Sequence, residues 1–278
     1  MTLKQVLDKG ILLLESENVP DAALDAWYLL SYVTQLSKAQ YFLKQNEEVD
    51  ELTIYKYKDV LLKRASRIPL QHITEEQDFM GIPFWVNEHV LIPRQDTETL
   101  VEEALKVIPS GSHVLDLCTG SGCVIISLVV LGQGITGIGV DVSDEALAVA
   151  KDNGNRLVGG RVHFVKGDLW QPVTGKFNAI VSNPPYIRTA DIEELTTEVK
   201  DHEPRLALDG MEDGLFFYRE IAEHAHEYLN EGGWLLVEIG YDQGPDVYAL
   251  FVENGFHDVE VVKDLAGNNR VVKGHLEV

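Results

Sequence analysis

The tetrapeptide Asn183-Pro184-Pro185-Tyr186 follows an apolar run, residues 177–182, that is typical of a buried strand. Its two prolines stiffen the loop and leave the loop carbonyls less available to local backbone hydrogen bonds. The Asn183 side-chain oxygen and the Pro184 carbonyl can then each accept one hydrogen of a planar NH2 group, and the Tyr186 ring can cover one face of a flat substrate. Such a site suits an amide or an exocyclic amine. Taken alone, the same residues fit an ordinary turn equally well.

A glycine loop upstream of this tetrapeptide favours a substrate site over an ordinary turn. The strand-like residues 113–118 run into Thr119-Gly120-Ser121-Gly122, and a helical pattern begins at Cys123. A strand, a glycine turn and a helix in this order let a ligand approach the backbone at the carboxyl edge of a sheet. The third glycine of a dinucleotide-binding loop is absent, because Ile125 occupies its position. Asp116 would repel a pyrophosphate but suits the ammonium and sulfonium charges of S-adenosylmethionine.

Two further acids follow the next two strand-like segments. Asp141 ends residues 136–141, where an acidic side chain commonly binds both ribose hydroxyls of an adenosine. Asp168 follows residues 161–165 and could accept a hydrogen bond from the adenine amine, while Leu169 could pack on the adenine ring. A single such acid is usually a turn or cap residue, but three at successive strand ends fit one adenosine. The predicted cofactor site comprises Asp116, Cys118, Thr119, Gly120, Ser121, Gly122, Asp141, Asp168, Leu169 and Asn183. Paired with the tetrapeptide, it indicates a methyl-transferring enzyme.

The order of patterns predicts two domains and a connector. Residues 1–75 carry helical spacing of apolar side chains, with Pro20-Asp21 at a helix start, and residues 76–96 contain two aromatic runs that flank Gly81, as in a β-hairpin. Over residues 97–278 helix-like and strand-like segments alternate, which predicts an α/β domain whose mostly parallel sheet is covered on both faces. We expect strands near 113–118, 136–141, 161–165, 177–182 and 233–239, and a closing antiparallel pair near 256–262 and 270–273.

Composition narrows the functional classes. The 278 residues include 45 acidic and 23 basic ones, a formal net charge of −22, and this balance disfavours a nucleic-acid substrate because no basic cluster offsets it. No apolar stretch approaches a membrane span and the N-terminus lacks a targeting pattern, so we expect a cytoplasmic protein without a membrane partner. Cys118 and Cys123 are too few for a metal site, and the histidines lack ligand spacing, so no metal is predicted.

With these motifs in this order, the chain resembles class I, Rossmann-like methyltransferases that use S-adenosylmethionine. More narrowly, it resembles the peptide chain release factor glutamine methyltransferases. The resemblance is carried by VLIPRQDTE (90–98), DLCTGSG (116–122), SNPPYI (182–187), EPRLAL (203–208) and DLAGNNRVV (264–272). Two departures are visible, since Cys118 replaces the family's usual glycine and Gln95 stands where a proline is common after Arg94. Neither removes a group that the chemistry needs, so both affect only fine geometry.

The resemblance implies methylation of the side-chain amide nitrogen of the glutamine in the Gly-Gly-Gln motif of release factors, with S-adenosylhomocysteine as product. An amide nitrogen is a poor nucleophile, so the site must desolvate and aim it, and no strong general base is expected. Asn183, Pro184 and Tyr186 are the predicted catalytic residues. The predicted substrate site adds Pro185 and Arg94, although Arg94 suits a surface salt bridge equally well. The helical domain is expected to dock the protein substrate.

Two other functions fit the same residues. An adenine amino-group methyltransferase acting on DNA or RNA would place a flipped base in the same pocket. The net charge and the lack of a basic segment interleaved with aromatic residues argue against it. A non-catalytic adenosine-binding or ribosome-associated interaction module would keep the fold but would not need Asn183.

Overall fold

The structure is a computed structural model that describes residues 1–277, and the chain divides into two compact units. The first unit contains Met1–Glu76 together with Thr196–His202, and the second contains Gln77–Leu195 and the chain from Glu203 onward. A short segment from late in the sequence therefore belongs, by its contacts, to the N-terminal unit. The sequence pattern does not predict that this segment packs with the N-terminal unit.

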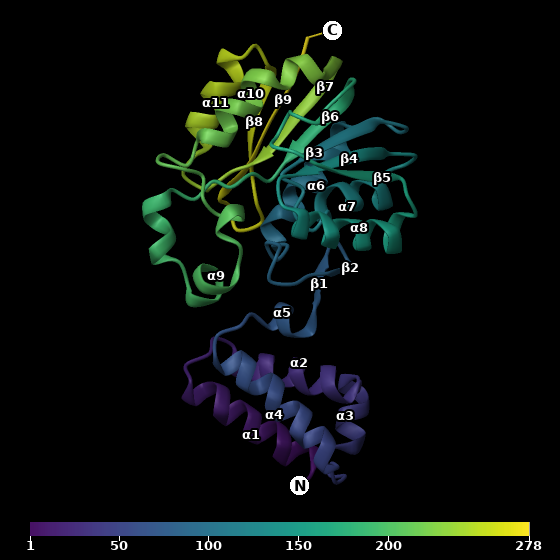
Figure 1. The fold of residues 1–278 in the computed structure, drawn as a ribbon, viewed down its shortest axis with the longest axis vertical. Helices are drawn as coiled ribbons and strands as arrows, with labels where there is room; N and C mark the ends of the chain where they lie inside the picture. Colours follow the sequence, from purple (N-terminus) through teal and green to yellow (C-terminus); the bar gives the residue numbers. More distant parts are fainter. Residues whose placement is uncertain (278) are drawn as a thin grey trace. The chain divides into compact units, whose positions relative to one another are not determined.

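The first unit is helical, as its apolar spacing predicts (Figure 1). Its core is formed by side chains such as Leu14, Ala26 and Leu29, which have no exposed surface. Thr2 caps the first helix with a capping box, and the expected helix start at Asp21 is confirmed. The helices are α1 (Leu3–Ser16), α2 (Ala22–Thr34), α3 (Lys38–Lys44), α4 (Glu51–Ala65), α5 (Leu70–Thr74) and α9 (Thr197–His202).

A buried ion-pair network holds α9 in this unit. Arg64 on α4 lies 2.6 Å from the Asp25 carboxylate on α2 and 3.0 Å from the Glu198 carboxylate on α9. Arg67 reaches the second oxygen of Glu198 at 2.7 Å. Removal of one partner from such a network would leave a buried charge unpaired, so these contacts specify where the segment packs.

The second unit is built on a mostly parallel sheet, as predicted (Figure 1). The strand order is β5-β4-β3-β6-β7-β9-β8, and β9 runs in the opposite direction to the other strands. The strands are β3 (His113–Leu117), β4 (Thr136–Asp141), β5 (Val162–Lys166), β6 (Phe177–Ser182), β7 (Leu229–Glu238), β8 (His257–Lys263) and β9 (Asn269–His275). A separate hairpin of β1 (Glu76–Phe79) and β2 (Ile82–Trp85) precedes them, also as predicted. β7 begins earlier than expected, because Leu229 pairs with Phe177 across a bulge.

Helices cover both faces of this sheet. One face carries α6 (Gln95–Val107), α7 (Cys123–Leu131) and α8 (Asp144–Val158), and the other carries α10 (Phe216–Tyr228) and α11 (Gly244–Glu253) (Figure 1). Successive strand residues alternate between the two cores, so that Val114 enters the first and Leu115 the second. Two short 3-10 helices, Thr189–Glu194 and Arg205–Ala207, follow β6. No helix in residues 1–277 has the length and apolar character to cross a membrane.

Candidate active site

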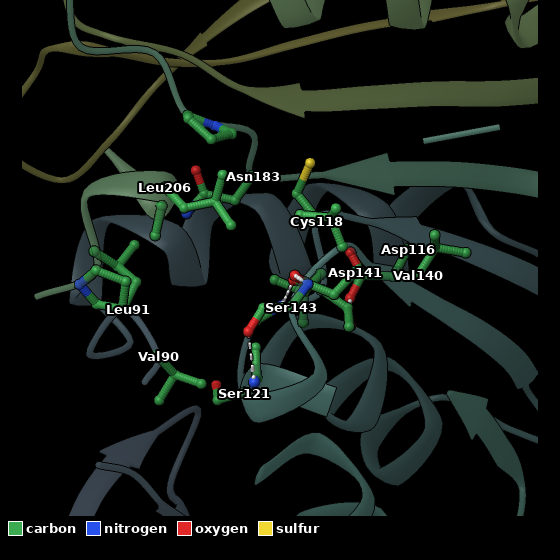
Figure 2. A pocket seen from close by; sticks show the side chains of 18 of the residues that line it. Val90, Leu91, Asp116, Cys118, Ser121, Val140, Asp141, Ser143, Asn183 and Leu206 are labelled. Atoms are coloured by element: carbon green, nitrogen blue, oxygen red, sulfur yellow. Dashed lines mark hydrogen bonds between the residues drawn. The ribbon is translucent and has the colours of Figure 1, made fainter. Parts of the chain in front are cut away.

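The carboxyl ends of four neighbouring parallel strands carry the predicted site residues. In sheet order β5, β4, β3 and β6, they are Asp168, Asp141, Asp116 and Asn183. Neighbouring strands lie about 4.8 Å apart, so these positions extend over roughly 14 Å of the sheet edge. All four residues line one cavity, with Asp141 and Ser143 seen toward one side and Asn183 beside Leu206 toward the other (Figure 2). The site is therefore an extended cavity along the sheet edge.

The glycine loop is held in shape by two side chains. Asp141 accepts hydrogen bonds from the Gly120 N–H at 2.8 Å and from the Ser143 N–H at 3.0 Å. Burial raises the pKa of the Asp141 carboxyl, and these backbone hydrogen bonds oppose the shift. Asn153 on α8, which has no exposed surface, donates to the Ser121 carbonyl at 3.0 Å. The loop's conformation thus depends on the end of β4 and on α8.

The backbone of the loop enters the left-handed region three times. Cys118, Gly120 and Gly122 have φ values of 58°, 54° and 80°. A Cβ atom on Gly122 would also lie 3.0 Å from Ile126 and 3.2 Å from Phe164, so this position needs glycine. Cys118 adopts a conformation that costs an L-residue about 1–2 kcal/mol. This explains why glycine is usual there, and burial raises the pKa of the Cys118 thiol, which keeps it neutral.

Asp116 lies between the loop and the sheet, with 1% of its surface exposed. Its carboxylate accepts a hydrogen bond of 2.6 Å from the Thr119 hydroxyl. Burial raises the pKa of Asp116 to about 7, and the Thr119 hydrogen bond opposes this shift. A cationic group in the cavity would favour the ionised carboxylate.

The charges around the cavity fit a cationic ligand. The lining includes the carboxyl groups of Asp116, Asp141 and Asp168, against the single guanidinium of Arg94. Arg94 is itself paired with Glu203 at 2.5 Å, and burial raises the pKa of that glutamate against the opposing effect of Arg94. These acidic side chains suit the sulfonium and ammonium groups of S-adenosylmethionine and disfavour a phosphate. Within residues 1–277 no group of three His, Cys, Asp or Glu residues is arranged to hold a metal ion.

At the end of β6, side chains and backbone fix the predicted tetrapeptide. The Asn183 Nδ2 donates to the Thr97 hydroxyl oxygen at 3.3 Å, which leaves the Asn183 Oδ1 as an acceptor. Among the described residues, no backbone N–H donates to the Pro184 carbonyl. The Ser182 hydroxyl donates to the Leu117 carbonyl at 2.7 Å, and so ties the end of β6 to β3. The Asn183 Oδ1 is therefore an acceptor in the cavity lining, and the Pro184 carbonyl beside it accepts no backbone hydrogen bond among the described residues.

Tyr186 has a different environment from the one expected. Its hydroxyl lies 3.3 Å from Glu238 Oε1 at the end of β7, and its ring packs against the core under α10 and α11. Gln243 donates to the Tyr186 carbonyl at 3.0 Å. Burial raises the pKa of the Tyr186 phenol above its usual value.

Most of the predicted site residues line the cavity. These are Asp116, Cys118, Thr119, Gly120, Ser121, Asp141, Asp168, Leu169, Asn183, Pro185 and Arg94. Gly122, Pro184 and Tyr186 are not in its lining.

Sequence reasoning did not identify several residues that shape the site. Thr97 contacts Asn183 from α6. It lies in the segment VLIPRQDTE that carries the family resemblance, but the resemblance assigned no role to this side chain. The burial of Asn153 could have been predicted, because it lies seven residues after Ala146 on the otherwise apolar face of α8. Leu206 lines the cavity from the second 3-10 helix, far along the chain from the other lining residues.

Comparisons with known proteins agree with this geometry. Residues 5–74 match the family described as the PrmC N-terminal domain, and residues 95–206 match the methyltransferase small domain. A release factor glutamine methyltransferase of Geobacter sulfurreducens is 41% identical over 276 residues, covering 99% of this chain and 97% of that protein. One from Clostridium acetobutylicum is 39% identical, covering 98% of each. A solved methyltransferase from Pyrococcus furiosus has a TM-score of 0.56 and 17% identity, covers 80% of this chain and 98% of that chain, and shows the fold alone.

The relatives and the fold define a methyltransferase with a mostly parallel sheet that closes in an antiparallel pair. Such enzymes use S-adenosylmethionine as methyl donor. At the identities and coverage of these relatives, the chain belongs to the release factor glutamine methyltransferase family.

Proposed function

We propose that this enzyme methylates the side-chain amide nitrogen of the glutamine in the Gly-Gly-Gln motif of peptide chain release factors. The observation that carries the proposal is the orientation of Asn183, whose NH2 group is occupied by Thr97 while its oxygen remains an acceptor. An acceptor at this place matches a substrate that presents NH2. Family membership supplies the protein that carries the glutamine.

The strand ends would hold S-adenosylmethionine in sheet order. Asp168 and Leu169 would bind the adenine, Asp141 the ribose, and Asp116 with the glycine loop the methionine part. When bound, this cofactor supplies a methyl group on a cationic sulfonium, and S-adenosylhomocysteine is the product. The acids that line this part of the cavity favour the cationic ligand over the neutral product.

The residues at the end of β6 would act on the substrate. The Asn183 Oδ1 and the Pro184 carbonyl accept the two amide hydrogens, which orients the nitrogen and removes it from water. The same two acceptors stabilise the positive charge that develops on nitrogen during transfer, and the proton leaves afterwards. Tyr186, bonded to Glu238, supports the tetrapeptide from behind and shapes the pocket.

The helical unit would dock the release factor. On α2, Leu24, Tyr28 and Tyr32 are 52%, 49% and 41% exposed, and their spacing of four residues places them in one stripe. Replacement of both tyrosines with serine should raise KM for an intact release factor about tenfold or more, because exposed aromatic residues dominate such interfaces. The same variant should methylate a short Gly-Gly-Gln peptide at the normal rate. Tyr55→Ser, which alters an exposed tyrosine on α4, serves as the control, and an unchanged KM in the double variant would refute this docking site.

A nucleic-acid substrate is less well supported. The net charge of −22 and the presence of one arginine among three acids in the cavity would repel a phosphate backbone. Release factors act in the cytoplasm, and we place the enzyme there with its substrate.

Mapping of transferred label tests the proposal. The purified protein is incubated with methyl-labelled S-adenosylmethionine and either an unmethylated release factor or unmethylated duplex DNA. Peptide mass spectrometry and nucleoside analysis then locate the label. Label on the Gly-Gly-Gln glutamine is the expected result. Label on adenine, or none on the release factor while the cofactor still binds, would overturn it.

A further inference from the structure

A line of polar side chains runs from the cavity into the buried interior of the second unit. Asn183 donates to Thr97, which is 2% exposed, at 3.3 Å. The Thr97 hydroxyl also faces Glu238, and hydrogen bonding from this hydroxyl lowers the pKa of the Glu238 carboxyl. Glu238 is also 2% exposed, and its Oε1 lies 3.3 Å from the Tyr186 hydroxyl. The other carboxylate oxygen, Oε2, is buried and has no hydrogen-bond donor within normal geometry among the described residues. The Thr97 hydroxyl is a donor that can serve it.

The direction of these hydrogen bonds depends on the charge of Glu238. A threonine hydroxyl has a single proton, and an ionised carboxylate can only accept. With Glu238 ionised, the Thr97 proton points at the carboxylate, and the Thr97 oxygen accepts from the Asn183 NH2 group. The Asn183 oxygen must then face the cavity. With Glu238 protonated, the carboxyl can donate to Thr97, the Thr97 proton can turn to Asn183, and the amide can rotate.

We propose that Thr97 and the ionised Glu238 are positioning residues that select which side of the Asn183 amide faces the substrate. This inference rests on the proposed function, because only a substrate that presents NH2 requires the Asn183 oxygen. A rotated Asn183 would present NH2 to NH2, so two donors would meet and the substrate amide would lose one of its two acceptors.

The surroundings of Glu238 make it the group that titrates in this line. Burial raises its pKa to about 7, against the opposing effects of Thr97, Arg270 and Tyr186. Burial also raises the pKa values of Tyr186, Tyr218 and Cys123, so these groups stay neutral near pH 7. The titratable and charged groups that face Glu238 are Tyr186 after β6, Arg270 on β9, Asp96 on α6, Tyr218 on α10 and Cys123 at the start of α7. Arg270 is paired with Asp96 at 3.2 Å. The productive orientation is therefore populated as pH rises through about 7.

Four variants test the inference through kcat at saturating cofactor and release factor over a range of pH. Thr97→Val removes the hydroxyl at nearly constant shape, and Glu238→Gln removes the charge. Each should lower kcat about tenfold or more, since a misdirected reacting group carries a cost of this order, with the affinity for S-adenosylmethionine unchanged. Thr97→Ser keeps the hydroxyl and should recover most of the rate. Thr99→Val, a buried threonine on the same helix, is the matched control and should behave as the wild type.

The pH profile separates a positioning role from a purely structural one. Thr97→Val should lose the same acid limb of kcat that Glu238→Gln loses. Infrared difference spectra give a second readout that needs no substrate, because the buried carboxyl of Glu238 should titrate at higher pH in Thr97→Val and unchanged in Thr97→Ser. An unchanged kcat, an intact acid limb or an unshifted carboxyl titration in Thr97→Val would overturn the inference. Failure of the wild type to methylate release factors would instead overturn the proposed function, and the infrared titration would still test the hydrogen bond from Thr97 to Glu238.

Discussion

The two ends of the cavity hold their polar groups in different ways. At the end of β4, the Asp141 carboxylate binds the backbone N–H groups of Gly120 and Ser143. At the end of β6, a side-chain amide is oriented by another side chain, as Asn183 is by Thr97. A backbone N–H can only donate, so the first end has a fixed polarity, whereas an amide or a hydroxyl can turn. The cofactor end should therefore respond to changes of backbone geometry, and the substrate end to changes of hydrogen-bond direction.

Removal of Asp141 tests the cofactor end and has the largest expected effect on cofactor affinity. Asp141→Ala should lower the affinity for S-adenosylmethionine about 10- to 100-fold, because it frees the Gly120 N–H and removes the proposed ribose contact, and hydrogen bonds to charged groups contribute about 1.5–3 kcal/mol. Titration calorimetry would measure it. Asp144→Ala, an exposed acid near the start of α8, is the control. Equal affinity in the Asp141 variant and the wild type would show that the loop does not depend on this carboxylate.

A second change tests whether the cofactor end depends on the backbone geometry of the glycine loop. Cys118 has a φ of 58°, which a β-branched side chain tolerates poorly. Cys118→Val should therefore lower the free energy of unfolding by about 1–2 kcal/mol. Cys118→Gly should change it by less than about 1 kcal/mol, because relief of strain and greater freedom of the unfolded chain offset one another. Urea unfolding of both variants would measure the difference, and equal effects of valine and glycine would contradict a strained loop.

A third prediction concerns the stability of the protein without cofactor. Burial raises the pKa of Asp116 from 3.8 to about 7, so the folded protein holds this proton more tightly than the unfolded chain does. Its contribution to stability is fully present below pH 3.8 and is lost as pH rises through about 7. The stability of Asp116→Asn relative to the wild type should therefore increase over this range. Thermal unfolding at several pH values would measure it, and a relative stability independent of pH would contradict the raised pKa.

Much of the fold could be predicted, because it is encoded in local patterns. The strands β3, β4, β5 and β6 are apolar runs that end in polar residues, and parallel strands bring those ends to one edge. The start of β7 could not be predicted, because Gly232-Gly233 interrupt its pattern and pairing with β6 forms it. The packing of α9 with the N-terminal helices was equally hidden, since it depends on ion pairs between Glu198 and arginines far away in the sequence.

The site likewise combines features that local sequence patterns encode with features that depend on distant contacts. The acids were found because each stands at or near the end of a recognisable strand. Thr97, Asn153 and Glu238 act through contacts with residues distant in the chain, and no local pattern reports which hydrogen bonds they form. For the same reason Tyr186 was expected over the substrate, whereas its hydroxyl is directed to Glu238.

We propose that Asn183 serves methyl transfer while the neighbouring strand ends serve cofactor binding. It is tested most directly by measuring, for Asn183→Ala, both kcat with an intact release factor and the dissociation constant of S-adenosylmethionine. We expect a kcat lower by about 100-fold or more, because an acceptor for the developing charge is lost, and a dissociation constant within about threefold of the wild type. A kcat close to that of the wild type, or a loss of cofactor affinity as large as the loss of rate, would contradict it.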